Sequence, residues 1–234
     1  MSKPSRCFAF FVTPHGFGHA SRAAAVAESL ARRLPQYQFQ FFTTIPEHHI
    51  AASIKDFHYQ ALDCDVGLVQ TDALRADLPR TLQRLKTFLP FDSAEGQRLV
   101  AYLRRQDCIA VISDISPLGL QVARAAALPS VLIENFTWDW IYRGYALRHP
   151  RMGDYADHLS SIFARADLHL QCQPICHIKS GGILTSPVSR RFQKDPATVR
   201  SQLGLSPATK MVFISMGGTP PSLPDLGMLG KHYG

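Results

Sequence analysis

Short apolar runs alternate with amphipathic stretches along most of the 234-residue chain. The apolar runs have the length of strands, and the stretches between them carry apolar residues at helical spacing. Strands are predicted at 7–12, 38–43, 57–62, 108–113, 129–134 and 167–172, and helices at 23–34, 78–89, 94–105, 118–127 and 154–166. This alternation predicts an α/β fold, a Rossmann-like doubly wound parallel sheet with helices on both faces.

A glycine-containing turn at 13–22 follows the first predicted strand and leads into the first predicted helix. Gly16 and Gly18 allow the backbone to turn sharply and to approach a ligand closely. The new helix offers free N–H groups and the positive end of its dipole at this point. His15 and His19 add two side chains that exchange protons near neutral pH. The turn is therefore the first candidate for a binding site.

Three interpretations of this turn come from the residues alone. A dinucleotide fingerprint would need a third small residue in phase, where Ser21 stands, and an acid at the end of the second strand, which instead ends in Thr43 and Thr44. A phosphate loop would need Gly-Lys-Ser/Thr, which is absent from the sequence. The third interpretation is a tight turn whose histidines cap the helix or pack.

The turn also resembles a known family. Gly18-His19 after an apolar strand, with Arg22 one helical turn later, is similar to the N-terminal domain of GT-B glycosyltransferases. The most similar groups are the MurG-like family 28 and the UDP-glycosyltransferases. This resemblance implies that His19 lies over the acceptor and serves as general base.

The continuous apolar run at 108–113 is typical of a central parallel strand buried on both faces. Asp114 ends this strand, 95 residues after His19. In the UDP-glycosyltransferases, an Asp at about this distance holds the histidine in its working tautomer, so the resemblance implies that role for Asp114. The alternative is a helix N-cap, because Asp or Ser before Pro117 is a good capping residue.

The segment 135–142 is the most aromatic part of the chain. Its two tryptophans and its tyrosine would suit sugar faces or an apolar acceptor, or a buried helix face. The segment also resembles the glycosyltransferase-like N-terminal part of plant L-arabinokinases, where this module precedes a sugar kinase. The predicted substrate-binding residues are His15, Gly16, Gly18, Arg22, Asn135, Trp138 and Asp139.

The resemblance divides the chain into three parts. Residues 1–185 correspond to the N-terminal, acceptor-type domain of a GT-B fold, and 186–208 to a linker with a short helix at 196–203. Residues 209–234 correspond to the start of a donor-binding domain, with a strand at 211–215. Gly217, Gly218 and Thr219 are predicted to meet the donor diphosphate through backbone N–H groups.

Composition and charge narrow the function classes. The formal charge is +7, and the basic residues are scattered rather than massed, which argues against a dedicated nucleic-acid binder. No run reaches 18 apolar residues, so no transmembrane segment is predicted, although contact with a membrane surface stays open. Cys7 and Cys108 are expected to be buried small apolar residues, and Cys172, Cys176 and His177 lack a second ligand pair for a metal site. No signal peptide is expected, so a reducing cytoplasm is predicted.

Together these features predict a glycosyltransferase that transfers a hexosyl group from a nucleotide sugar, UDP-linked, to an acceptor hydroxyl with inversion. The acceptor is a small molecule or a lipid. No metal or cofactor is expected beyond the nucleotide sugar as co-substrate. The 234-residue chain is expected to be an incomplete enzyme, inactive alone. The alternatives are a non-catalytic GT-B-like binding or regulatory module, as found upstream of a sugar kinase, and one subunit of a split enzyme with a donor-domain partner chain.

Overall fold

A computed structural model describes residues 6–72, 74–91 and 93–213. Within these residues, seven strands form one parallel sheet in the order β3-β2-β1-β6-β7-β8-β9. The strands are β1 (Cys7–Val12), β2 (Gln38–Phe42), β3 (His58–Gln60), β6 (Cys108–Asp114), β7 (Ser130–Glu134), β8 (Leu168–Cys172) and β9 (Ile183–Thr185). The predicted α/β doubly wound fold is therefore confirmed.

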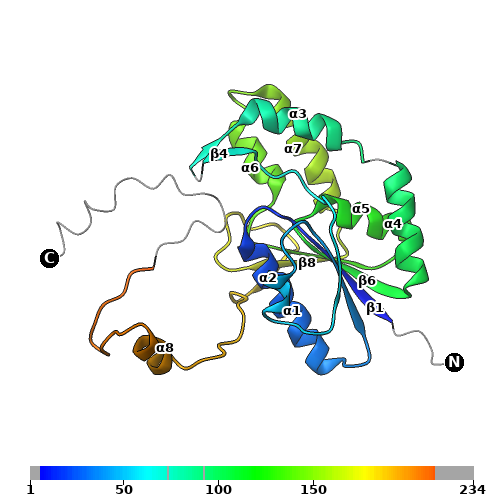
Figure 1. Cartoon of the computed structure of the whole chain (residues 1–234). Coiled ribbons are helices and arrows are strands. Elements are labelled where there is room, and N and C mark those ends of the chain that lie inside the picture. The colour runs from blue at the N-terminus through cyan, green and yellow to red at the C-terminus, as the bar shows by residue number, and fades with distance from the viewer. Residues whose placement is uncertain (1–5, 73, 92, 214–234) are drawn as a thin grey trace.

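Helices cover both faces of this sheet (Figure 1). The helices are α1 (Phe17–Arg33), α2 (His48–Ala51), α3 (Leu78–Phe88), α4 (Ser93–Arg105), α5 (Pro117–Ala126), α6 (Trp138–Tyr145), α7 (Pro150–Phe163) and α8 (Pro196–Gln202). One apolar core packs α1 and α2 against one face of the sheet. On the opposite face, a second core packs α4 and α5, and a third packs α6 and α7, against the sheet. The fold thus has the three layers expected for continuous apolar strands.

The strand order reverses between β1 and β6. The chain leaves β1 toward β2 on one side, and it leaves β6 toward β7 on the other. In open α/β sheets the crevice outside the carboxyl ends of the strands at such a switch point is where ligands bind. The turn after β1 and the end of β6 both lie at this point. The strand order therefore predicts a ligand site between them.

Several boundaries differ from the sequence predictions. The helix predicted at 23–34 begins earlier, at Phe17, because Gly16 already makes the turn. The stretch 63–77, predicted as a loop, contains a small antiparallel pair, β4 (Gln70–Asp72) and β5 (Arg75–Ala76). The short edge strand β9 was not predicted. The strand predicted at 211–215 is not formed over 211–213, and the rest of it lies outside the described residues.

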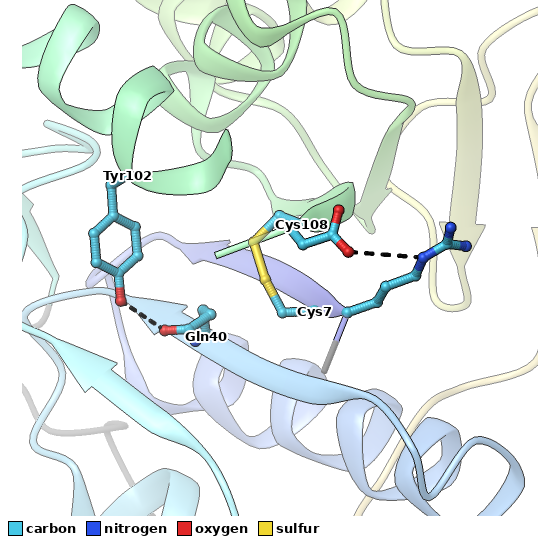
Figure 2. Close-up of a disulfide and its surroundings, with 6 residues drawn as sticks. Cys7, Gln40, Tyr102 and Cys108 are labelled. Carbon is cyan, nitrogen blue, oxygen red and sulfur yellow. Dashed lines mark hydrogen bonds and ion pairs between the residues drawn. A yellow bond between two sulfur atoms is a disulfide. The ribbon is translucent and has the colours of Figure 1, made fainter. Parts of the chain in front are cut away.

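The cysteines of β1 and β6 differ from expectation as well. Cys7 and Cys108 are buried, as predicted, but they form a disulfide, not two separate thiols. The bond joins adjacent strands at their amino ends, next to the hydrogen bond from the Tyr102 hydroxyl to Gln40 (Figure 2). It therefore links the two strands that lead to the switch point. Cys64, Cys172 and Cys176 are free.

Candidate functional site

The first helix starts directly over the switch point because of one glycine. Gly16 has φ 96° and ψ 147°, a conformation in which a side chain would be strained, and it is the N-cap of α1. Gly18 follows in the first turn, where an added Cβ would meet nothing within 4 Å. His19 therefore enters the crevice from the first turn of α1, and its side chain is 10% exposed.

Asp114, the last residue of β6, is in contact with His19. The Nδ1 atom of His19 lies 2.7 Å from Oδ1 of Asp114, and both side chains are buried. The cap of α5 is not Asp114 but Ser116, whose hydroxyl accepts from the backbone N–H of Gly119. The carboxylate is therefore free of capping and is directed at the histidine.

Strained backbone follows Asp114. Ile115 has φ 49°, which is rare for a β-branched residue, and it is fully buried. Residues held in such conformations cost about 1–3 kcal/mol and cluster at functional sites. The strain supports the view that the position of Asp114 matters for more than packing.

Arg22 takes both oxygens of the same carboxylate. Its Nε donates to Oδ2 of Asp114 at 2.7 Å, and one terminal nitrogen donates to Oδ1 at 2.6 Å. The other terminal nitrogen donates to Oδ1 of Asn135 at 2.9 Å. Arg22 and Asn135, both predicted to bind substrate, are thus brought together with the His–Asp pair, and the guanidinium of Arg22 is bonded to protein groups.

The pKa values of Asp114 and Arg22 are both shifted so that each side chain stays charged. Burial alone would raise the pKa of Asp114, but the charges and hydrogen bonds of Arg22 and His19 outweigh it and lower the pKa below its usual value. Burial likewise opposes the charge of Arg22, and Asp114 more than compensates, which raises the pKa of the guanidinium. The pair is therefore ionised at neutral pH.

The tautomer of His19 follows from these contacts. A terminal nitrogen of Arg22 also lies 3.2 Å from Nδ1 of His19. Nδ1 cannot both donate to Asp114 and accept from Arg22. The shorter contact is to the carboxylate, and an unprotonated Nδ1 at 2.7 Å from a carboxylate oxygen would be repulsive, so Nδ1 carries the proton. Nε2 is then an acceptor, and the side-chain hydrogen bonds of His19 to the described residues all involve Nδ1.

His15 has a different environment. Its ring lies edge-on to Trp138, with ring centroids 4.9 Å apart, and against Gly67. Burial, together with the charge of His19, lowers the pKa of His15 to about 4. His15 is therefore neutral at physiological pH and is a weaker base than an ordinary histidine.

The loop before β4 adds a residue that sequence reasoning missed. Asp65 is buried, accepts from the backbone N–H groups of Val66 and Gly67, and accepts from the indole N–H of Trp138. Burial raises the pKa of Asp65 to about 7, and these donors offset only part of the shift. No periodicity marks this stretch, so only an acid in a loop predicted near the site mouth could have drawn attention to it.

The aromatic segment 135–142 has some side chains in the core and others at the surface. Trp138 and Tyr142 are fully buried, and the Tyr142 hydroxyl donates to the carbonyl of Gly67 at 2.7 Å. Trp140 is 40% exposed. Asp139 is buried and accepts from Nζ of Lys179 at 3.1 Å, away from the His–Asp pair. The indole N–H of Trp138 is thus already used inside the protein.

The predicted donor residues Gly217, Gly218 and Thr219 lie outside the described residues. Within the described ranges, no group of three or more His, Cys, Asp or Glu side chains is placed to hold a metal ion. In those ranges there is also no helix both long and apolar enough to cross a bilayer. Two cavities of about 530 and 600 Å³ lie beside α5, and neither is lined by His19 or Asp114. The candidate site is therefore identified by the contact between these two residues and by its position in the sheet, and not by the size of a cavity.

No protein-family model matches the chain. The chain is 29% identical over 228 residues to an L-arabinokinase of Arabidopsis thaliana, an alignment that covers 91% of this chain and 21% of the relative. The chain thus spans about a fifth of the length of this curated relative.

Similar solved structures include two glycosyltransferases and MurG. MurG of Acinetobacter baumannii is 13% identical, with a TM-score of 0.44, over 78% of this chain and 45% of that one. The glycosyltransferase SsfS6 of Streptomyces sp. SF2575 is 13% identical, with a TM-score of 0.47, over 81% and 56%. The spinosyn forosaminyltransferase SpnP is 14% identical, with a TM-score of 0.45, over 82% and 54%. These similarities concern the fold, and the function proposed for the chain does not rest on them.

Proposed function

We propose that this chain is the acceptor-binding half of a GT-B glycosyltransferase and that His19 is its general base. The observation that carries the proposal is the 2.7 Å contact between His19 and Asp114 at the switch point of the sheet. The contact orients Nε2 as a proton acceptor, which is the role of a histidine in other His–Asp pairs. The donor is a nucleotide sugar, UDP-linked, and the transferred group is a hexosyl unit.

In the proposed reaction, Nε2 of His19 accepts the proton of an acceptor hydroxyl as its oxygen attacks the anomeric carbon. The new C–O bond forms while the bond from that carbon to the diphosphate oxygen breaks, and the diphosphate leaves with the electron pair. Direct attack on the opposite side implies inversion. Asp114 keeps the imidazole oriented and stabilises its charged form. Gly217, Gly218 and Thr219 are proposed to supply donors to the diphosphate.

A second candidate function is a non-catalytic sugar-binding or regulatory module. One observation in its favour is that Arg22 neutralises Asp114 and lies 3.2 Å from Nδ1 of His19. The imidazole then faces a neutral ion pair in place of a bare carboxylate, which reduces the stabilisation of its charged form. The similarity to an L-arabinokinase over 91% of this chain also favours this candidate. In that role Nε2 of His19 would accept a hydrogen bond from a ligand hydroxyl without taking the proton.

The test uses the full-length protein as its own cell produces it. UDP release from UDP-linked hexoses is measured in the presence of hydroxyl acceptors for wild type, His19→Ala and the exposed control His158→Ala. A general base contributes roughly 10²- to 10⁴-fold, so His19→Ala should lose that much turnover while His158→Ala retains it. Unchanged turnover in His19→Ala would refute the base. Wild-type protein that binds a sugar through His19 but never releases UDP would support the second candidate.

A further inference from the structure

A cavity of about 600 Å³ lies between α4 and α5, and we call it the α4–α5 cavity. The two helices lie side by side, on the face of the sheet opposite α1 (Figure 1). The loop after α3 and one side chain of α7 complete the wall of the cavity. Its volume is within the range of roughly 300–1,000 Å³ that is typical of small-molecule sites. Neither His19 nor Asp114 lines it, so it is separate from the candidate site.

The floor of the α4–α5 cavity is apolar. Leu118 and Val122, about one helical turn apart on α5, line it and are almost fully buried. Phe91, in the loop after α3, and Val100, on α4, also line it and pack in the same apolar core. Binding an apolar group here would remove that group and the exposed part of these side chains from water, which is favourable. The cavity therefore favours a ligand with an apolar body.

Small residues leave the cavity open along both helices. Gly96 and Ala101 on α4, and Ala125 on α5, all line it. Glycine inside a helix is less favourable than alanine, and an added Cβ on Gly96 would meet nothing within 4 Å among the described residues. Packing within the described chain therefore does not require a glycine at this position, and the space in front of it is available to a ligand.

The end of the cavity at the last turn of α4 is positively charged. Arg104 donates there to the carbonyl of Ala125 at 3.5 Å, which is longer than a usual hydrogen bond. Arg104 forms no ion pair with a carboxylate in the described part of the chain. The ends of α4 and α5 each carry a partial negative charge of about one half, but their last turns also carry Arg105 and Arg124. The full charges of the arginines exceed these partial charges, so this end attracts an anion.

The other polar side chains of the lining do not oppose an anion. They are Gln97, Gln121 and His158, and none of the described residues that line the cavity is acidic. The two amides and the imidazole each offer a hydrogen-bond donor. A molecule with an apolar body and one acidic head group therefore matches both the floor and the charged end of the cavity.

We propose that the α4–α5 cavity binds a small amphipathic carboxylate, such as a medium-chain fatty acid, with its carboxylate at Arg104. Gly96 and Arg104 lie about 12 Å apart along the axis of α4, which is the length of chain that such a molecule would lay over the apolar floor. Arginine and carboxylate form stronger hydrogen bonds than neutral groups do. The proposal does not depend on the chain being a transferase.

The experiment is isothermal titration calorimetry of this chain with octanoate, decanoate and decanol, each below the concentration at which it aggregates. Decanoate should bind roughly tenfold more tightly than octanoate, because each buried methylene group adds to the affinity. Decanoate should also bind about tenfold more tightly than decanol, which has no charge to pair with Arg104. Arg104→Met should remove the preference for decanoate and leave the affinity for decanol unchanged.

A variant that fills the cavity tests the location of the ligand. Gly96→Leu places a side chain in the open space and should abolish the binding of decanoate and of decanol. Gly144→Leu is the matched control, because Gly144 is also a helical glycine whose added Cβ would meet nothing within 4 Å, and it does not line the cavity. It should bind both ligands as the wild type does. Ala101→Leu replaces Gly96→Leu if that variant does not fold.

Three results would overturn the proposal. The first is no binding of decanoate to the wild type. The second is equal affinity of the wild type for decanoate and decanol, which would show that the charge of Arg104 has no part in binding. The third is binding that persists in the variant that fills the cavity, which would place the ligand elsewhere on the chain.

Discussion

The guanidinium of Arg22 holds both carboxylate oxygens of Asp114, at 2.7 and 2.6 Å, with only 10% of the arginine side chain exposed. Breaking a buried pair by removing one partner costs about 3–5 kcal/mol, because the other charge is left uncompensated. Arg22→Met should therefore lower the free energy of unfolding by about that amount. The double variant Arg22→Met/Asp114→Asn should recover part of the loss, which urea unfolding of both would show.

An exposed pair in the same chain provides the control. Arg84 and Asp63 form a similarly close pair, 2.9 Å apart, but about half of each side chain is exposed. Exposed pairs contribute about 0–1 kcal/mol, so Arg84→Met should be nearly neutral. Equal losses in Arg22→Met and Arg84→Met would contradict the structural role given to Arg22.

Asp65 should make stability depend on pH. Its pKa in the folded chain, about 7, is above its ordinary value of 3.8, so the folded state holds a proton that the unfolded state has released. Stability from this group is present at low pH and is lost as the pH rises from about 4 to about 7, by at most about 1.4 kcal/mol per pH unit. Asp65→Asn should remove this downward contribution to the pH dependence of stability.

His15 should change stability with pH in the opposite direction to Asp65, over nearly the same pH range. Its pKa in the folded chain, about 4, is below its ordinary value of 6.5, so its contribution is present above pH 6.5 and is lost as the pH falls toward 4. The two effects oppose each other in the wild type, so its slope should be smaller than that of either variant. Unfolding free energies measured from pH 4.5 to 6.5 should rise with pH in Asp65→Asn and fall with pH in His15→Gln. Parallel slopes in the two variants would refute the assignment.

Gly67 is needed where the loop passes over His15. Its φ is +58°, and an added Cβ would lie 2.9 Å from Nδ1 of His15 and 3.1 Å from Trp138. Gly67→Ala should cost about 2–4 kcal/mol from backbone strain and overpacking. Gly18→Ala is the matched control, because a Cβ there meets open space, and it should range from no change to about 1 kcal/mol of stabilisation. Thermal unfolding of both variants decides whether Gly67 is required.

The disulfide between Cys7 and Cys108 gives a chemical prediction. It closes a loop of 101 residues, for which chain entropy gives a stabilisation of at most about 4–5 kcal/mol. A reducing agent should lower the stability of the wild type and leave Cys7→Ala/Cys108→Ala unchanged. Peptide mapping without reductant should show Cys7 and Cys108 joined and Cys176, which is exposed, alkylated. Alkylation of Cys7 and Cys108 before reduction would contradict the bond.

The sequence predicted the parts of the fold that leave a local pattern. Strands β1, β6 and β7 are continuous apolar runs because they are buried on both faces. Strand β9 has only three residues after two glycines, so no period could form. The disulfide depends on the pairing of two strands distant in sequence, which neither strand encodes by itself.

The candidate site was predictable to the same extent. His19 and Asp114 were identified through a resemblance to a family, and the structure places them in contact. The ion pair of Arg22 with Asp114 was not predicted, because a basic residue on a helix gives no sign of whether it meets a ligand or a buried carboxylate. Glu134 ends an apolar strand, so its pairing with His169 on the next strand was hidden as well.

The tautomer of His19 is the most direct test of the account, and ¹⁵N NMR of the imidazole in this chain measures it. We predict a proton on Nδ1, donated to Asp114, and an unprotonated Nε2 able to accept from a ligand hydroxyl. Asp114→Asn should shift the ring toward the other tautomer. A wild-type proton on Nε2, with Nδ1 accepting from Arg22, would contradict the account, because the ring would then have no free nitrogen to accept from a ligand hydroxyl.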